Sequence, residues 1–182
     1  MRLFYAVKIP EEVKDVILSY SSNYKQYEGI KIQGRSLLHI TMLFMGEVNR
    51  ENLEDIDSIA RSLEEIDFST RICIDSAGVF PNKIFPNIIW AGSRRPDEKL
   101  ICLSDAMKNR FGKYTGKQKS KKFTPHVTVC RIKKPQENIN ILEFKENICF
   151  DIEGFSLFDS TLTPRGPVYN ELNSYKFIRS SD

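Results

Sequence analysis

The chain of 182 residues contains no long hydrophobic run. No stretch approaches the roughly 18 consecutive apolar residues of a membrane-spanning helix. The first residues pass directly into a strand-like pattern, without the apolar region and small-residue cleavage site of a signal peptide. The glycine motifs that bind nucleoside triphosphates or dinucleotides are absent as well. We therefore expect a cytoplasmic protein with no membrane association and no motif-bound nucleotide.

Cysteine is also scarce, and its four positions are far apart. None of the four belongs to a C-x-x-C pair, and each has apolar neighbours: Cys73, Cys102, Cys130 and Cys149. This spacing is typical neither of a disulfide framework nor of a zinc site. We expect four reduced, buried thiols.

The net charge is only +3, but the basic residues are clustered. The segment 113–122 carries five lysines and no acid: Lys113, Lys117, Lys119, Lys121 and Lys122. Such a run is usually a solvated loop, and its alternative role is contact with a polyanion. Because the run ends four residues before His126, we take Lys121 and Lys122 as candidate contacts to such a polyanion.

The hydrophobic periodicity predicts an α+β protein. Alternation predicts strands at 2–9, 38–45, 68–80, 87–92, 124–132, 148–161 and 168–178. Helical spacing predicts helices at about 11–27, 49–63 and 97–111, with a short further helix at 137–144. This order favours mostly antiparallel sheet with helices on one side. No flexible linker divides the chain, so we expect residues 1–182 to form one domain.

Histidine is the scarcest residue with acid–base chemistry, and its two positions have matching surroundings. Each histidine is followed by an apolar residue and then by threonine, in His39-Ile40-Thr41 and His126-Val127-Thr128. Side chains two positions apart project from the same face of a strand. Each segment therefore offers an imidazole and a hydroxyl on one face and buries its apolar residue on the other.

Two imidazoles on either side of one substrate suit the hydrolysis of a phosphate diester. One histidine takes a proton from water and the other protonates the leaving oxygen, since the imidazole pKa lies near neutrality. The hydroxyls of Thr41 and Thr128 can donate hydrogen bonds to the non-bridging oxygens. No metal is required. A metal site is in any case poorly supported, because neither histidine has a carboxylate or cysteine partner nearby in the sequence.

Several segments together resemble the 2H phosphoesterase family, and most closely its branch of RNA 2',3'-cyclic phosphodiesterases, historically called 2'-5' RNA ligases. The resemblance covers nearly the whole chain. It is carried by residues 2–10, the two histidine motifs at 39–48 and 123–131, and the C-terminal segments 157–160 and 166–169.

The resemblance implies a bilobed, pseudo-twofold α+β fold, with mostly antiparallel sheets lining a central cleft and helices outside. It implies hydrolysis of a terminal 2',3'-cyclic phosphate of RNA to a 2'-phosphate, with tRNA fragments among the substrates and reversible 2'-5' ligation as a further activity. By the same analogy, His39 is the proton donor, His126 is the proton acceptor, and Thr41 and Thr128 hold the phosphate. A monomer without cofactor or metal is expected.

Other interpretations stay open. Arg131 is a candidate phosphate ligand, but strict alternation places it on the face opposite His126, so it reaches the site only from a rim or past a bulge. The same site could act on small cyclic nucleotides or on an ADP-ribose cyclic phosphate. A non-catalytic RNA-binding module is the alternative from another class. The sequence alone cannot decide which histidine is the acid.

Overall fold

The structure, a computed structural model, describes residues 1–115, 123–133, 139–164 and 166–178. The α-helices in this part of the chain are α1 (Glu11–Ser22), α2 (Leu53–Glu64) and α3 (Glu98–Arg110). The strands are β1 (Arg2–Lys8), β2 (Ile30–Ile32), β3 (His39–Glu47), β4 (Thr70–Ile74), β5 (Ser76–Phe80), β6 (Ile88–Gly92), β7 (His126–Ile132), β8 (Ile148–Ile152), β9 (Gly154–Thr163) and β10 (Gly166–Lys176). Short 3-10 turns occur at Arg35–Leu37 (η1), Arg50–Asn52 (η2) and Gly112–Tyr114 (η3).

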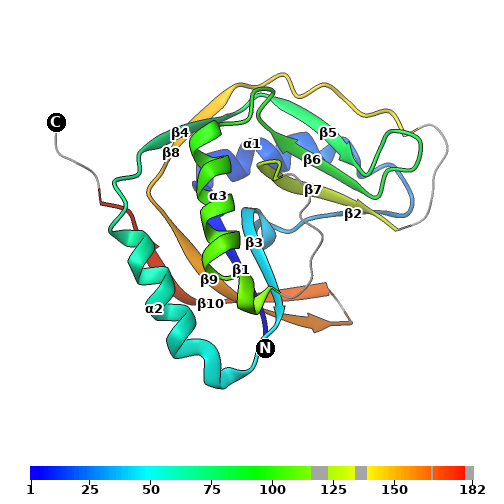
Figure 1. Cartoon of the computed structure of the whole chain (residues 1–182). Helices are drawn as coiled ribbons and strands as arrows, with labels where there is room; N and C mark the ends of the chain where they lie inside the picture. The colour runs from blue at the N-terminus through cyan, green and yellow to red at the C-terminus, as the bar shows by residue number, and fades with distance from the viewer. Residues whose placement is uncertain (116–122, 134–138, 165, 179–182) are drawn as a thin grey trace.

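Eight of the strands form one sheet, in the order β10-β9-β1-β3-β7-β6-β5, with β2 paired to β7. Strands β4 and β8 form a separate two-stranded ribbon. Every pairing between these named strands is antiparallel, so the predicted α+β class is confirmed. In Figure 1 the β5–β6 hairpin lies at the upper right and the β9–β10 hairpin at the lower right, with α2 and α3 on the opposite side.

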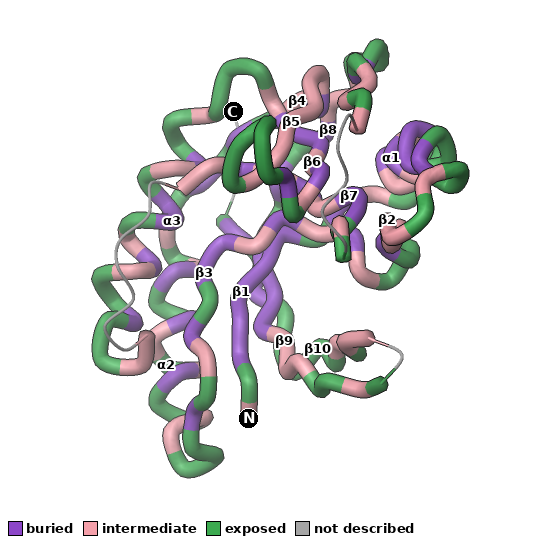
Figure 2. The backbone as a smooth tube through the Cα atoms, turned by 90° about the vertical axis from the view of Figure 1, so that its right-hand side faces the viewer, coloured by how far each residue is buried: buried purple, intermediate pink, exposed green. Residues whose placement is uncertain are grey.

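The helices bury the apolar faces that their spacing predicts. In α3 the buried side chains are Leu100, Leu103 and Met107, and Phe111 follows them into the core. In α2 they are Ile56, Ala60 and Leu63. Figure 2 shows the buried parts of α2 and α3 turned toward β3 and toward β1, whose own residues are mostly buried. Burial of these faces, rather than helix propensity, fixes the helices on the sheet.

Two predicted helical segments are shorter than expected. Helix α1 ends at Ser22 and not at 27, because the Asn23 amide donates to the Tyr20 carbonyl (2.8 Å) and closes the helix. The described residues 139–144 form no helix. There two tyrosines bind the backbone of Leu142. Tyr20 Oη of α1 donates to its carbonyl (2.8 Å), and its N–H donates to the Oη of Tyr24, just after α1 (3.0 Å). Residues 137 and 138 of that prediction lie outside the described part of the chain.

The prediction of four reduced, buried cysteines is wrong. Cys73 on β4 and Cys149 on β8 lie directly opposite each other, with their Cα atoms 4.0 Å apart, and form a disulfide. Cys102 is exposed on α3, and Cys130 alone is the buried free thiol that was expected. The spacing of the cysteines gave no sign of this pair because the two strands are 76 residues apart in sequence.

None of the helices in the described residues has the length and apolar character of a membrane span.

Candidate active site

The two histidine motifs meet at a single point of the sheet. Strands β3 and β7 pair only at Ile40 and Val127, which are the central residues of the two motifs. Both side chains are fully buried. Because side chains alternate along a strand, the flanking histidines and threonines project from the other face of the sheet. We call this face, which carries His39, Thr41, His126 and Thr128, the histidine face.

Each motif strand contains an extra residue at the same distance from its histidine. The register of β3 against β1 skips Met42, and the register of β7 against β6 skips Val129. These β-bulges restart the alternation, so that both strands read half-buried, buried, half-buried, buried, buried, exposed from the histidine onward.

The bulges return the sixth residue of each pattern to the histidine face. That residue is Phe44 in β3 and Arg131 in β7. Strict alternation from each histidine predicts both on the opposite face. For Phe44 this prediction is wrong, because its ring lies 5.6 Å from Phe4, which in turn lies 5.1 Å from His39. For Arg131 the anticipated route past a bulge is the one observed. The only sequence signal was a second consecutive apolar residue, Leu43 or Cys130, just before it.

Both imidazoles are held by the backbone two residues upstream. The Nδ1 of His126 donates to the Thr124 carbonyl (2.7 Å), which fixes the ring and leaves Nε2 unengaged by that bond. The His39 ring hydrogen-bonds to the backbone of Leu37, and its Nε2 lies 3.0 Å from Thr41 Oγ1. The two motifs thus repeat one another in their support as well as in their sequence.

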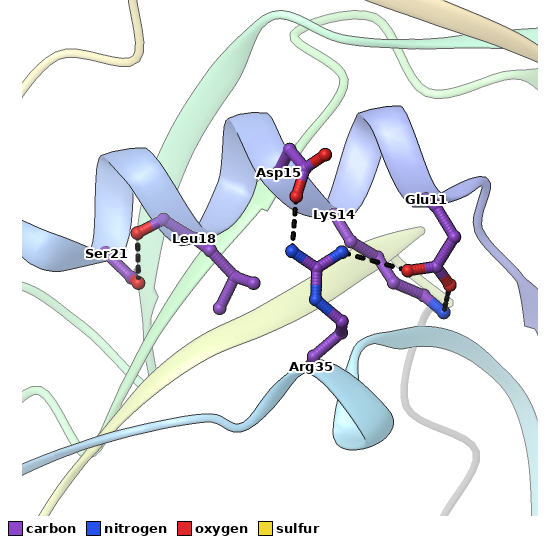
Figure 3. Close-up of polar contacts among 6 residues, drawn as sticks. All are labelled: Glu11, Lys14, Asp15, Leu18, Ser21 and Arg35. Atoms are coloured by element: carbon purple, nitrogen blue, oxygen red, sulfur yellow. Dashed lines mark hydrogen bonds and ion pairs between the residues drawn. The ribbon is translucent and has the colours of Figure 1, made fainter.

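The turn that supplies Leu37 is tied to helix α1. Arg35, at the start of η1, extends its guanidinium to Asp15 and to Glu11 Oε2 (2.9 Å) on α1, as Figure 3 shows. Glu11 is also paired with Lys14. These contacts are exposed, so they contribute little to the free energy of folding. Their consequence is positional, because they hold the segment that leads into His39 against the helix.

Burial and positive charge both lower the pKa of the histidines. Burial is the main cause for His39, whose pKa falls to about 4, while the hydrogen bond to Leu37 acts in the opposite direction. The charges of His126 and Arg131 lower the pKa of His39 further. The pKa of His126 is lowered by burial and by Arg131. Each histidine is therefore neutral at pH 7 in the free protein, and the three groups are near enough to act on each other.

Arg131 is the cation of the histidine face. Its side chain is exposed, and no carboxylate among the described residues pairs with it. Its charge acts on Tyr169 as well as on both histidines. A guanidinium left without a counter-ion, within electrostatic reach of two imidazoles, favours a bound anion.

Aromatic rings surround each histidine. His39 lies 5.1 Å from Phe4, 5.4 Å from Tyr169 and 6.4 Å from Phe158, measured between ring centroids. His126 lies 4.9 Å from Phe80 and 6.3 Å from Trp90. Sequence reasoning named none of these rings, because they come from five strands that are adjacent only in the folded sheet.

Some predicted site residues are not brought to this face. Lys121 and Lys122 lie outside the described residues, so their role in RNA contact stays a prediction. Lys113, the first lysine of the run, is paired with Asp55 (2.7 Å) beside α2. Among the residues that the structure describes, no three His, Cys, Asp or Glu side chains gather as metal ligands.

A family model described as "2'-5' RNA ligase superfamily" matches residues 13–161. The chain is 31% identical to a protein of Methanocaldococcus jannaschii named RNA 2',3'-cyclic phosphodiesterase, over 96% of this chain and 100% of the relative. It is 30% identical to a Thermus thermophilus protein of the same name, over 96% of this chain and 89% of that protein.

Solved structures share the fold. The crystal structure of the Thermus thermophilus protein TT0787 superposes with a TM-score of 0.88 at 29% identity, with both chains covered completely. The crystal structure of Escherichia coli LigT in apo form superposes with a TM-score of 0.83 at 23% identity, over 98% of each chain. The α+β fold with mostly antiparallel sheet, which the family resemblance implied, is therefore confirmed.

Proposed function

The chain belongs to the 2'-5' RNA ligase superfamily, and from this membership we propose that it is an RNA 2',3'-cyclic phosphodiesterase that leaves a 2'-phosphate. The observation that carries the proposal is the meeting of His39, His126 and Arg131 within electrostatic reach on one face of the sheet. That arrangement offers an acid, a base and an anion-binding cation from the side chains of the protein itself.

In the proposed reaction, water attacks the phosphorus of the cyclic phosphate as His126 takes its proton. The bond from phosphorus to O3' breaks on the opposite side, and His39 gives a proton to O3'. Nucleophile and leaving group stand in line across the phosphorus, so one histidine is needed on each side. The pairing of β3 with β7 at Ile40 and Val127 supports such an arrangement of the two histidines.

The remaining groups hold the phosphate. We assign Thr41 and Thr128 as hydrogen-bond donors to the non-bridging oxygens, where charge accumulates in the transition state. We assign Arg131 as the cation that neutralises this charge, since no carboxylate of the described residues competes for it. None of these steps uses a metal.

The terminal nucleoside is proposed to lie on the His39 side, because O3' belongs to its ribose. Phe44, half exposed and adjacent to Phe4, and Tyr169 supply ring surface there for the base. Stacking of a base on an aromatic ring tolerates any nucleotide, which suits an enzyme that acts on RNA ends of varied sequence.

The proton donor must receive its proton together with the substrate. The pKa of His39 is lowered to about 4 in the free protein, and the anionic phosphate of the substrate opposes the effect of burial and of Arg131. Protonation of His39 and binding of the substrate are therefore coupled. The value of kcat/KM, which reports the free protein and the free substrate, should be greatest below pH 6.5.

Both motifs come from one chain and meet at one strand pair. We therefore propose that residues 1–182 act as a single catalytic unit and as a monomer. Small cyclic nucleotides or an ADP-ribose cyclic phosphate are alternative substrates of the same site. Reversible 2'-5' ligation uses the same two proton transfers, with a hydroxyl in place of water.

The test is incubation of a short RNA ending in a 2',3'-cyclic phosphate, in EDTA, with wild type and with His39→Gln and His126→Gln. Glutamine keeps a polar side chain of similar length but transfers no proton. We expect conversion to the 2'-phosphate by wild type and a loss of about 10²–10⁴-fold in each variant. Added imidazole should restore part of the activity of the corresponding alanine variants.

Two results would contradict the proposal. Activity that disappears in EDTA and returns with a divalent ion would exclude the metal-independent mechanism. A wild-type protein that turns over no cyclic phosphate, together with histidine variants that bind RNA as tightly as wild type, would favour a non-catalytic RNA-binding module.

A further inference from the structure

The proposed hydrolysis needs one nucleoside beside the phosphate, but rings flank both histidines. Phe44 and Tyr169 lie on the His39 side. On the His126 side, Phe80 and Trp90 lie 5.5 Å apart with their ring planes 29° from parallel. Both are partly exposed. We call Phe80 and Trp90 the His126-side ledge.

The register of the strands places this ledge on the histidine face. Trp90 pairs with Thr128, and Gly78 on β5 pairs with Trp90. Directly opposed residues of an antiparallel pair project to the same side of a sheet. Phe80, two positions after Gly78, projects to that side as well.

The residues beneath the Trp90 ring are glycines, which have no side chain. A Cβ atom on Gly78 would stand 2.3 Å from Trp90 Cζ2, and one on Gly92 would stand 3.2 Å from Trp90 Cζ3. The indole therefore lies flat over two glycines of adjacent strands. Its Nε1–H is buried and is the one such side-chain group of the described residues without a hydrogen-bond partner.

An indole that serves only to fill a core usually pairs its N–H, because leaving the group unpaired is costly. Here the ring rests on Gly78 and Gly92 without a hydrogen bond. A flat aromatic surface beside the proton acceptor is what base stacking requires. Water, the nucleophile of hydrolysis, does not stack on an aromatic ring and does not need this surface.

We infer that the His126-side ledge is a second nucleoside subsite, which takes the nucleoside joined to the phosphate through its 5' oxygen. This inference rests on the proposed function. In the direction of bond formation, the 5'-hydroxyl gives its proton to His126 as its oxygen attacks phosphorus. The P–O3' bond breaks, His39 protonates O3', and the product is a 2'-5' phosphodiester. No other reactant is consumed.

Trp90 is the only tryptophan of the chain, so its fluorescence reports on the ledge alone. We would titrate the wild-type protein, at low temperature in EDTA, with adenosine 2'-monophosphate and with two dinucleotides. One is ApA with a 2'-5' linkage, whose second nucleoside lies beyond the phosphate. The other is ApA with a 3'-5' linkage and a terminal 2'-phosphate, whose second nucleoside precedes the terminal one.

We expect the 2'-5' dinucleotide to quench the fluorescence and to bind about 10-fold more tightly than the mononucleotide, as one stacked base predicts. The 3'-5' dinucleotide should gain neither effect. Stronger quenching by the 3'-5' dinucleotide would overturn the inference, because the ledge would then hold the preceding nucleotide. Equal affinities without quenching would also overturn it and leave the ledge as support for His126.

Calorimetry on variants separates the ledge from general damage. In Trp90→Leu the ratio of the affinities for the 2'-5' dinucleotide and the mononucleotide should fall to about one. In Phe85→Leu, at an exposed ring of the hairpin turn, the ratio should keep its wild-type value. A ratio that persists in Trp90→Leu would contradict the inference. A wild-type protein that does not open cyclic phosphates would refute the proposed function, but the titration would still decide whether the ledge binds.

Discussion

The halves of the sheet that end in β3 and β7 share one backbone plan and differ in the side chains placed on it. Both have a histidine held by a carbonyl two residues upstream, a threonine two residues on, and a bulge directly after it. At the sixth position one half has Phe44 and the other has Arg131. Opposite the threonines, one half has Ala6 and the other has Trp90.

The difference shows how a nearly symmetric acid–base pair acquires a direction. Two equal halves would bind a phosphate ester in either orientation. A cation on one side and a ring on the other distinguish the two orientations, and each stands at the position that the bulge exposes. In the proposed mechanism, the motif residues supply the chemistry and their unlike neighbours determine the orientation of the substrate.

The largest effect is expected from removing the cation that distinguishes the two halves, Arg131. Arg131→Gln should lower kcat/KM by about 10²–10³-fold, because no other lysine or arginine of the described residues acts on both histidines and could hold the phosphate charge. The measurement is steady-state hydrolysis of an RNA cyclic phosphate. Arg50→Gln, at an exposed position in η2, is the matched control. Equal activity of the two variants would remove Arg131 from the site.

Removing the ring on the other side should have a smaller effect. Phe44→Ala should raise KM for RNA about 10-fold with little change in kcat, because a stacking surface is lost and the proton transfers are kept. Phe85→Ala removes another exposed ring, in the turn between β5 and β6 and outside both motifs, and serves as control. A fall in kcat without a change in KM would mean that Phe44 supports His39 and does not bind the base.

The smallest expected effect is a shift in the pH dependence of activity when Arg131 is replaced. The positive charge of Arg131 lowers the pKa of both histidines, so Arg131→Gln should raise both values. The bell-shaped profile of kcat/KM should move to higher pH, by up to about one unit. An unmoved or acid-shifted profile in the residual activity of this variant would show that Arg131 does not act on the histidines.

Alternation and helical spacing were enough to predict much of this arrangement. They placed His39, Thr41, His126 and Thr128 on strands with their side chains on one face, and they identified the buried face of α3. The bulges could not be predicted by alternation, because the extra residues, Met42 and Val129, are apolar like their neighbours. The same is true of the rings around each histidine and of the disulfide, which depend on strand neighbours far apart in sequence.

The disulfide between Cys73 and Cys149 has a further consequence for the two halves, in terms of chain topology. It closes a covalent ring that contains His126, while His39 lies on the linear segment that precedes the ring. A single backbone cut inside the ring leaves one covalent molecule until the disulfide is reduced. A cut in the segment between β3 and α2 separates His39 from His126 at once, and from then on the two histidines are held together only by the sheet.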